Sequence, residues 1–266
     1  MQLSARIIGE TNRETILFIS GFVGSYETWD RHFQSLGERY RLVMIDTLGF
    51  GHSPKPDIDY SVDDHLAAIQ NTLRAHQVDS AHIVGHSMGC LLALAYANRY
   101  PQRSGRLALL AFPSFDNEAQ ARLAIRHGSL FNRWLAMDTP LARVACALMC
   151  AFRPLLMPIA PHLVRHVPAV VATDALRHNW NSYSKTLRNV IFKSDSTRWM
   201  QGFKGAVLLV HGARDQTAPL VNVRRFNSRP NVRLIVLDAD HGLIFSHGHT
   251  IAAELNTFFG NAGLQP

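Results

Sequence analysis

The most informative stretch of the sequence is residues 81–98, AHIVGHSMGCLLALAYAN. Its first four residues are typical of a buried β-strand, and the small and apolar residues that follow are typical of a helix packed closely on a sheet. Between them, Gly85, Ser87 and Gly89 form the pattern G-x-S-x-G. A sharp strand-to-helix turn favours glycine on both sides of the serine, because larger side chains would crowd it. We therefore predict a nucleophilic serine at a helix N-terminus, where free N–H groups can stabilise an oxyanion.

Short apolar runs alternate with helical patterns on both sides of this turn. The runs are TILFIS (15–20), RLVMID (41–46), AHIVG (81–85), RLALLAF (106–112), AVLLVHG (206–212) and VRLIVLD (232–238). The first four are mostly uninterrupted, as strands buried on both faces should be, and the pattern resumes in the last two. This alternation predicts a mostly parallel sheet. Ser61 can cap a helix with Asp64, and an apolar face follows at Val62, Leu66, Ile69 and Leu73. With a last helix near Thr250–Phe259, the sequence predicts an α/β fold with helices flanking the sheet.

The middle of the chain differs from both ends. Residues 114–204 contain no convincing strand pattern, and prolines recur at positions 140, 154, 158, 161 and 168. Helical spacing is fragmentary, as in Trp180, Tyr183, Leu187 and Ile191, or in Leu130, Trp134, Leu135 and Met137. We expect a core formed by residues 1–113 and 205–266, with residues 114–204 inserted between two strands as a helical cap.

A serine hydroxyl is a weak nucleophile unless a base activates it, and the base needs a carboxylate to orient it. Asp215 comes just after the run AVLLVHG, and His241 follows the run VRLIVLD. Both therefore belong to loops at the carboxyl edge of the sheet, where distant segments can meet. The alternatives for the base are His247 and His249, and the alternatives for the acid are Asp238 and Asp240. We prefer His241 and Asp215, since Asp238 and Asp240 adjoin the histidine too closely to face its far nitrogen.

The length of 266 residues, with 47% apolar and 18% charged side chains, fits one α/β domain with a sizeable core. The formal net charge is +7. Residues 114–204 hold twelve basic and five acidic side chains, and the remaining chain holds fifteen of each. All of the excess thus belongs to the predicted cap. Without a basic run or a binding motif, this distribution argues against nucleic acid as a partner.

The three cysteines, Cys90, Cys146 and Cys150, cannot all pair, and none has the spacing of metal ligands. We therefore expect packed thiols, a reducing compartment such as the cytoplasm, and no metal or other cofactor. The first residues lack the apolar core of a signal peptide. The sequence leaves the oligomeric state open.

The most apolar stretch is Leu141–Val164, but it contains Arg143, Arg153 and three prolines. Charges and helix-breaking residues at this density disfavour a membrane span. The pattern instead predicts a broken pair of helices packed on a core, with no stable membrane insertion.

These motifs together resemble the α/β-hydrolase superfamily of serine hydrolases, in the capped branch that includes carboxylesterases and carbon–carbon bond hydrolases. The resemblance covers nearly the whole chain and is carried by Phe18-Ile19-Ser20-Gly21-Phe22, Asp46-Thr47-Leu48-Gly49-Phe50-Gly51-His52-Ser53, the turn at Ser87, His211-Gly212-Ala213-Arg214-Asp215 and Asp240-His241-Gly242. It implies that the backbone N–H groups of Phe22 and Met88 form the oxyanion hole, and that residues 46–53 form a structural turn. The chain departs from the family at Ser20, where histidine is usual, and at Gly242-Leu243, where a proline is usual shortly after the histidine.

The resemblance implies hydrolysis of a carboxylic ester through an acyl-serine intermediate, with Ser87, His241 and Asp215 as the triad and no cofactor. The same residues could cleave a carbon–carbon bond in a vinylogous diketone, a thioester, or the methyl ester of a carrier-protein conjugate. A ligand-binding receptor that retains the triad is the alternative outside enzymes.

The aromatic residues and methionines of the predicted cap suit an apolar acyl pocket, or else simply pack the cap on the core. They are Phe131, Trp134, Met149, Phe152, Met157, Trp180, Tyr183 and Phe192. The basic excess of this segment has three interpretations: a solvated face, a docking surface for an acidic carrier protein, or attraction of an anionic substrate.

Overall fold

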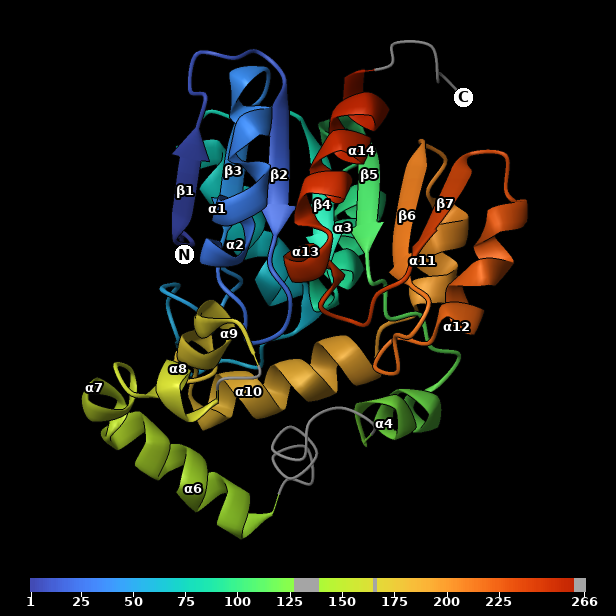
Figure 1. Cartoon of the computed structure of the whole chain (residues 1–266). Helices are drawn as coiled ribbons and strands as arrows, with labels where there is room; N and C mark the ends of the chain where they lie inside the picture. The colour runs from blue at the N-terminus through green and yellow to red at the C-terminus, as the bar shows by residue number, and fades with distance from the viewer. Residues whose placement is uncertain (127–138, 165–166, 261–266) are drawn as a thin grey trace.

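The structure, a computed structural model, describes residues 1–126, 139–164 and 167–260 (Figure 1). The described chain is built around a seven-stranded sheet of order β1-β3-β2-β4-β5-β6-β7. β1 is antiparallel to β3, and all other neighbouring strands are parallel. The strands are β1 (Ala5–Ile8), β2 (Thr15–Ile19), β3 (Arg41–Ile45), β4 (Ala81–His86), β5 (Ser104–Leu110), β6 (Val207–Gly212) and β7 (Val232–Leu237). The predicted α/β fold with a mostly parallel sheet is confirmed.

Helices cover both faces of this sheet (Figure 1). They are α1 (Glu27–Phe33), α2 (Val62–Ala75), α3 (Met88–Arg99), α12 (Leu220–Arg224), α13 (Leu243–Ser246) and α14 (Gly248–Gly260), with short 3₁₀ turns η1 (Gln34–Glu38), η2 (Pro101–Arg103) and η4 (Arg225–Ser228). Ser61 caps α2 as predicted, because its hydroxyl accepts a hydrogen bond from the N–H of Asp64 while the Asp64 carboxylate accepts one from the N–H of Ser61. Leu66, Ile69 and Leu73 form its buried face.

The core is divided into two layers by the alternation of strand side chains. In β2, Leu17 and Ile19 pack in the cluster that contains α2 and α3, whereas Ile16 and Phe18 pack in the cluster that contains α1 and α14. Every residue of β2 is buried. A strand covered on both faces needs apolar side chains at all positions, which explains why these runs lack an alternating pattern.

Between β5 and β6, the described residues form helices and loops, as the proline-rich pattern predicts. The helices are α4 (Glu118–Arg126), α6 (Pro140–Ala151), α7 (Arg153–Leu156), α8 (Ala160–Leu163), α9 (Ala169–Asp174), α10 (Trp180–Thr186), the π-helical turn η3 (Leu187–Phe192) and α11 (Ser196–Gly202). Pro140, Pro154 and Pro161 lie in the first turns of α6, α7 and α8, where their missing N–H groups cost no helical hydrogen bond. The pattern at Leu130, Trp134, Leu135 and Met137 lies outside the described residues.

Most of these helices lie beyond the carboxyl edge of the sheet, below it in Figure 1. The last of them, α11, instead packs beside α3, and its Met200 is buried in the cluster of α2 and α3. The limits of the cap at residues 114 and 204 stay a prediction.

The expectation that residues 141–164 pack on a core is wrong for one side of these helices. The segment is broken as predicted, into α6, α7 and α8. Ala142, Cys146 and Ala160 are buried, but Leu141 and Leu163 are among several large apolar side chains that remain exposed. A short helix at the edge of a molecule can bury only the side that faces its neighbours, so apolar residues all round it cannot all be covered. Within the described residues, no helix has both the length and the apolar character needed to span a bilayer.

Gly89 permits α3 to approach β2 closely. A Cβ atom at this position would lie 2.2 Å from the carbonyl oxygen of Ile19 and 2.9 Å from that of Ser20. Both obstacles are backbone atoms of a buried strand end, so neither can move cheaply. We expect Gly89→Ala to lower the free energy of unfolding by about 3 kcal/mol, measured by urea denaturation.

Gly24→Ala is the matched control for that measurement. Its Cβ would lie no closer than 3.4 Å to any neighbour, so we expect a change within about 0.5 kcal/mol. Equal losses of stability in the two variants would contradict the close approach at Gly89.

Candidate active site

Ser87 lies at the turn between β4 and α3. Its backbone has φ 51° and ψ −121°, a conformation that residues with side chains rarely adopt. The N–H of Ser87 donates a 2.9 Å hydrogen bond to the carbonyl of Leu110 at the end of β5. A Cβ on Gly85 would lie 2.6 Å from the backbone carbonyl of Gly89, which explains the glycine before the serine. Ser87 thus occupies a strained strand-to-helix turn, the position that the G-x-S-x-G pattern predicts.

The structure brings Ser87, His241 and Asp215 together from three separate segments. His241, in the loop after β7, has its Nε2 atom 2.9 Å from Ser87 Oγ. Its Nδ1 atom lies 2.8 Å from Asp215 Oδ2, in the loop after β6. With the proton on Nδ1, that nitrogen donates to the carboxylate and leaves Nε2 as an acceptor for the serine hydroxyl. This tautomer allows the histidine to act as a general base.

The Asp215 carboxylate is buried but fully engaged. Its second oxygen, Oδ1, accepts hydrogen bonds from the N–H groups of Thr217 at 2.9 Å and Ala218 at 2.8 Å. Burial alone would raise the pKa of Asp215, but the hydrogen bond and charge of His241 and the Ala218 amide outweigh it and hold the pKa below its ordinary value. The carboxylate therefore stays ionised near neutral pH and can stabilise a positive charge on His241.

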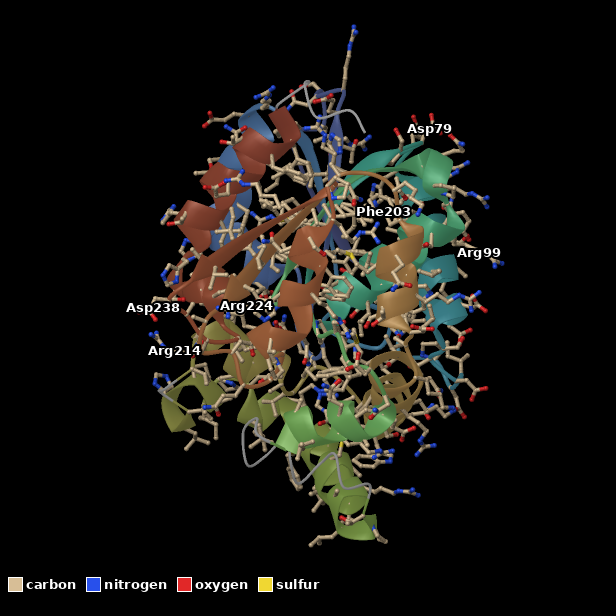
Figure 2. All side chains as sticks on the ribbon, turned by 90° about the vertical axis from the view of Figure 1, so that its right-hand side faces the viewer. Asp79, Arg99, Phe203, Arg214, Arg224 and Asp238 are labelled. Atoms are coloured by element: carbon tan, nitrogen blue, oxygen red, sulfur yellow. The ribbon has the colours of Figure 1, made fainter. Side chains whose placement is uncertain are left out.

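The alternative acids and bases from the sequence are engaged elsewhere. Asp238 pairs with Arg214 at the surface (Figure 2), and the carboxylate of Asp240 accepts a hydrogen bond from the N–H of Gly242. His247 contacts the hydroxyl of Ser246, and the ring of His249 packs against the ring of His32 with 4.8 Å between centroids. The geometry thus favours His241 and Asp215.

His86, the residue before the serine, was not among the candidate site residues, although it lies in the motif. Its Nε2 atom is 3.3 Å from the carbonyl oxygen of His241, and the two rings are 5.5 Å apart. Burial, followed by repulsion from His241, lowers the pKa of His86 to about 3. His86 is therefore neutral and can donate to that carbonyl, which positions the His241 backbone.

The loop after β2 lies against the nucleophile turn. A Cβ on Gly21 would come within 3.3 Å of the Ser87 Cβ and 3.0 Å of the His86 ring. Phe22 follows in this loop, and Met88 is the buried first residue of α3. Ser20, which replaces the histidine usual in the resembled family, is buried, donates to the carbonyl of Ile45 and accepts from Trp29 Nε1. These bonds fix the start of the loop without a histidine.

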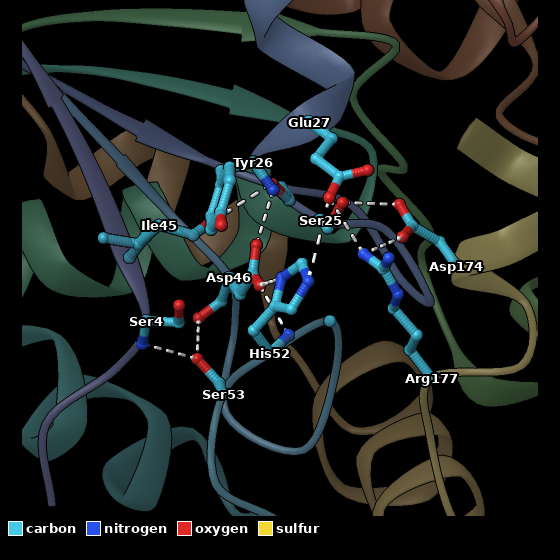
Figure 3. Close-up of polar contacts among 12 residues, drawn as sticks. Ser4, Ser25, Tyr26, Glu27, Ile45, Asp46, His52, Ser53, Asp174 and Arg177 are labelled. Carbon is cyan, nitrogen blue, oxygen red and sulfur yellow. Dashed lines mark hydrogen bonds and ion pairs between the residues drawn. The ribbon is translucent and has the colours of Figure 1, made fainter. Parts of the chain in front are cut away.

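A second polar cluster joins the core to the helices between β5 and β6 (Figure 3). Buried Asp46, after β3, accepts hydrogen bonds from the N–H groups of Tyr26 and His52 and from the His52 ring. Close by, Ser25 donates a 2.7 Å hydrogen bond to Asp174 at the end of α9.

Arg177 extends the same cluster by contacting Glu27 at 3.1 Å and Asp174 at 3.3 Å. Residues 46–53 thus form a turn held by hydrogen bonds, with Ser53 Oγ donating to the Asp46 carbonyl. Sequence reasoning did not identify Asp174 or Arg177, because nothing local in the sequence links them to Ser25 or Glu27.

This cluster predicts a dependence of stability on pH. Burial raises the pKa of Asp174 to about 6, against the opposing effects of the Ser25 hydroxyl and Arg177 and with the added repulsion of Glu27 and Asp46. A raised pKa means that the folded state binds the proton more tightly than the unfolded state does. The resulting stabilisation is present below about pH 4 and is lost as the pH rises through about 6.

We expect wild type to lose roughly 2 to 3 kcal/mol relative to Asp174→Asn as the pH rises from about 4 to 7. Denaturant unfolding at a series of pH values measures this difference. Taking the difference in unfolding free energy between wild type and Asp174→Asn cancels the contributions of titrating groups that both proteins share, including Asp46. A difference between the two proteins that stays constant with pH would contradict the shifted pKa.

Comparison with known proteins supports the same fold. Residues 14–140 match a family model described as alpha/beta hydrolase fold. A crystallised hydrolase from Pseudomonas aeruginosa superposes with a TM-score of 0.77 at 20% identity, covering 97% of this chain and 94% of that one. This chain has the α/β-hydrolase fold. An enol-lactonase from Burkholderia xenovorans also shares the fold, with a TM-score of 0.74 at 21% identity over 97% and 96% of the two chains.

The sequence relatives of this α/β-hydrolase-fold chain include plant proteins. It is 31% identical to the probable lysophospholipase BODYGUARD 4 of Arabidopsis thaliana, over 92% of this chain and 64% of the relative. It is 30% identical to the probable lysophospholipase BODYGUARD 3 of the same plant, over 85% of this chain and 52% of the relative. The chain thus spans between about half and two thirds of the length of these curated relatives.

The α/β-hydrolase-fold chain presents no evident metal centre in its described residues, where no three His, Cys, Asp or Glu side chains converge as ligands would. Cys90, Cys146 and Cys150 are free thiols, the last two on α6. The groups that converge at the carboxyl edge of the sheet are those of general-base and nucleophilic chemistry.

Proposed function

We propose that this chain is a serine hydrolase that cleaves carboxylic esters with a mostly apolar acyl group. The observation that carries the proposal is the continuous hydrogen-bonded path from Ser87 Oγ through the His241 ring to Asp215. A hydroxyl, an imidazole and a buried carboxylate in this order convert a weak nucleophile into an effective one. A receptor that only binds its ligand has no chemical use for the path.

In the acylation step, the Ser87 oxygen attacks the ester carbonyl carbon while His241 Nε2 takes the hydroxyl proton. The carbonyl electron pair moves to oxygen, and the N–H groups of Phe22 and Met88 bind the resulting oxyanion. When the carbonyl reforms, the bond to the alcohol oxygen breaks and His241 returns the proton to that oxygen. The alcohol leaves, and the acyl group remains on Ser87.

In the deacylation step, water repeats these events in place of the alcohol. His241 removes a proton from water as its oxygen attacks the acyl carbon, and the same N–H groups bind the second oxyanion. The bond to Ser87 Oγ then breaks, His241 protonates Ser87, and the carboxylic acid leaves. Asp215 holds the ring and stabilises its positive charge in both steps.

Aromatic side chains beside the oxyanion loop support an apolar acyl group. The Phe22 ring packs 5.2 Å from that of Phe50 and 4.8 Å from that of Tyr183 on α10. Tyr183 and Phe192 belong to a cluster contributed by the helices between β5 and β6, against which Phe22 packs. We therefore infer that residues 114–204 act as a cap over Ser87.

Other predicted pocket residues have different surroundings. Met149 and Met157 pack in a separate cluster around Ala160, and Phe152 is exposed. Phe131 and Trp134 lie outside the described residues.

Two further observations support parts of this proposal. Relatives named probable lysophospholipases would act on esters of apolar acyl chains, which is the proposed substrate class. Three free cysteines suit a reducing compartment such as the cytoplasm, where we place the enzyme.

A chain-length series of p-nitrophenyl esters tests the proposed reaction. We expect a burst of p-nitrophenol followed by steady turnover, because an activated ester forms the acyl-serine faster than water hydrolyses it. Absence of turnover across the series would overturn the ester proposal. Faster cleavage of a vinylogous diketone or of a thioester would instead assign one of those bonds to the same residues.

A further inference from the structure

The outer side of α6, α7 and α8 exposes a row of large apolar side chains. They are Leu141, Val144, Leu148, Phe152, Leu155, Ile159 and Leu163, hereafter the α6–α8 apolar face, and each is between 46% and 72% exposed. Single exposed apolar residues are ordinary on protein surfaces, but a contiguous set of this kind marks an interaction site. Figures 1 and 2 both place α6 at the lower end of the molecule, away from the sheet.

Within α6, Leu141, Val144 and Leu148 lie on one side, because they are three or four positions apart in a single helix. The exposed apolar residues then continue along the chain through Phe152, α7 and α8. Other residues of the segment are buried: Ala142 packs in the cluster of Tyr183 on α10, Ala160 packs with Ala172 on α9, and Cys146 is 1% exposed. The seven residues of the α6–α8 apolar face are thus exposed, whereas Met149, Leu156 and Met157 pack inward on the Ala160 cluster.

The charged residues within this stretch of the sequence are of one sign. Between Asp138 and Asp174 the sequence has no acidic residue, although it has arginines at 143, 153 and 165 and histidines at 162 and 166. Arg143 and His162 are exposed on α6 and α8 themselves. Residues 114–204 also carry the chain's entire net charge of +7. An apolar face on a segment whose charged side chains are all basic complements a surface that offers hydrocarbon below a layer of negative charge.

We propose that the α6–α8 apolar face docks on the surface of an anionic phospholipid layer. Six of its seven side chains are aliphatic, whereas the side chains that dominate protein–protein interfaces are Trp, Tyr and Arg. The helices are too short to span a bilayer, so they lie in its interfacial plane with the cations among the head groups.

This docking would direct the catalytic side of the molecule toward the lipid. Arg153, beside the apolar face, donates a 2.7 Å hydrogen bond to the carbonyl of His178, which precedes α10. On α10, the Tyr183 ring contacts Phe22 in the loop next to Ser87. The proposal goes beyond the hydrolase function, because lipid binding by this face needs none of the triad.

Flotation with large unilamellar vesicles tests the proposal. The probes are vesicles of phosphatidylcholine alone and vesicles of phosphatidylcholine mixed with phosphatidylglycerol. We expect wild type and Ser87→Ala to float equally with the mixed vesicles, less with the neutral ones, and less again at high salt. Leu155→Glu and Leu163→Glu should each weaken binding by roughly tenfold or more, since each removes apolar contact and adds repulsion.

Val221→Glu is the matched control. Val221 is 72% exposed, as is Leu163, but it lies on α12, away from α6 in Figure 1. The Val221→Glu protein should bind vesicles as strongly as the wild type does. All three substituted positions are exposed, so circular dichroism should show unchanged folding.

Four results would overturn the proposal. One is absence of flotation of the wild type, and another is equal loss of binding in Val221→Glu and Leu163→Glu. The third is that the wild type does not bind vesicles but self-associates as its concentration rises, and that Leu155→Glu abolishes this self-association. That result would make the face an interface between copies of the chain. Loss of flotation in Ser87→Ala alone would place the lipid at the catalytic serine rather than on this face.

Discussion

Ser87→Ala is expected to lower kcat for p-nitrophenyl esters by about ten-thousandfold or more. The substitution removes the only atom that can form the acyl intermediate and leaves His241 without its proton donor. Ser87 Oγ is 2.9 Å from His241 Nε2. Residual rate would come from binding and from the N–H groups of Phe22 and Met88 acting on attack by water. Initial rates at saturating ester, with the folded state checked by circular dichroism, measure the effect.

Ser228→Ala controls for loss of a serine hydroxyl in general. Ser228 is an exposed residue in η4, and its hydroxyl donates to the carbonyl of Arg225. We expect its kcat to stay within about twofold of wild type. If folded Ser87→Ala kept a rate close to that of Ser228→Ala, Ser87 would not be the nucleophile.

Asp215→Asn is expected to lower kcat by about ten-thousandfold with little change in folding. The side-chain amide would keep the shape of the carboxylate but could direct its N–H₂ group at His241 Nδ1. That nitrogen would then accept a hydrogen bond and the proton would move to Nε2. A protonated Nε2 cannot take the proton of Ser87, so the base would be lost through the wrong tautomer.

Asp238→Asn is the matched control, because Asp238 is also a carboxylate in the segment that leads to His241. It pairs at the surface with Arg214 rather than with the histidine. Its kcat should remain within about twofold of wild type. A larger loss of kcat in Asp238→Asn than in Asp215→Asn would show that Asp238, and not Asp215, is the carboxylate that orients His241.

Much of the fold is predictable because the central strands are buried on both faces. The runs 15–20, 41–46 and 206–212 have uninterrupted apolar centres, and the structure places β2, β3 and β6 within them. The edge strand β1 has only four residues, and none of them is fully buried. It is held by pairing with β3 rather than by its own apolar pattern, so the local sequence contains little signal for it.

The three triad residues are predictable for a related reason. Each stands at the carboxyl end of a recognisable strand, and parallel strands bring these ends to one edge. The second contact of Asp215, with the amides of Thr217 and Ala218, depends on a loop conformation that no pattern specifies. The same holds for His86, since its contact with the carbonyl of His241 joins residues far apart in the sequence.

The segment between β5 and β6 is the hardest part of the chain to predict, because the burial of its side chains depends on how its helices pack on the core. Residues 141–164 are apolar enough to indicate burial, and periodicity alone cannot say that their large side chains face outward. The pairing of Ser25 with Asp174 likewise joins residues 149 positions apart. Both features depend on how the helices dock on the core, which is a property of the folded chain.

The most direct test of the catalytic account is labelling with a fluorophosphonate, followed by mass mapping of the labelled peptide. Attack by the serine oxygen breaks the phosphorus–fluorine bond and leaves a stable phosphonyl ester on the nucleophile. The account predicts one label, on Ser87, that disappears in Ser87→Ala and forms much more slowly in Asp215→Asn. A label on any other residue of the wild-type protein would contradict it.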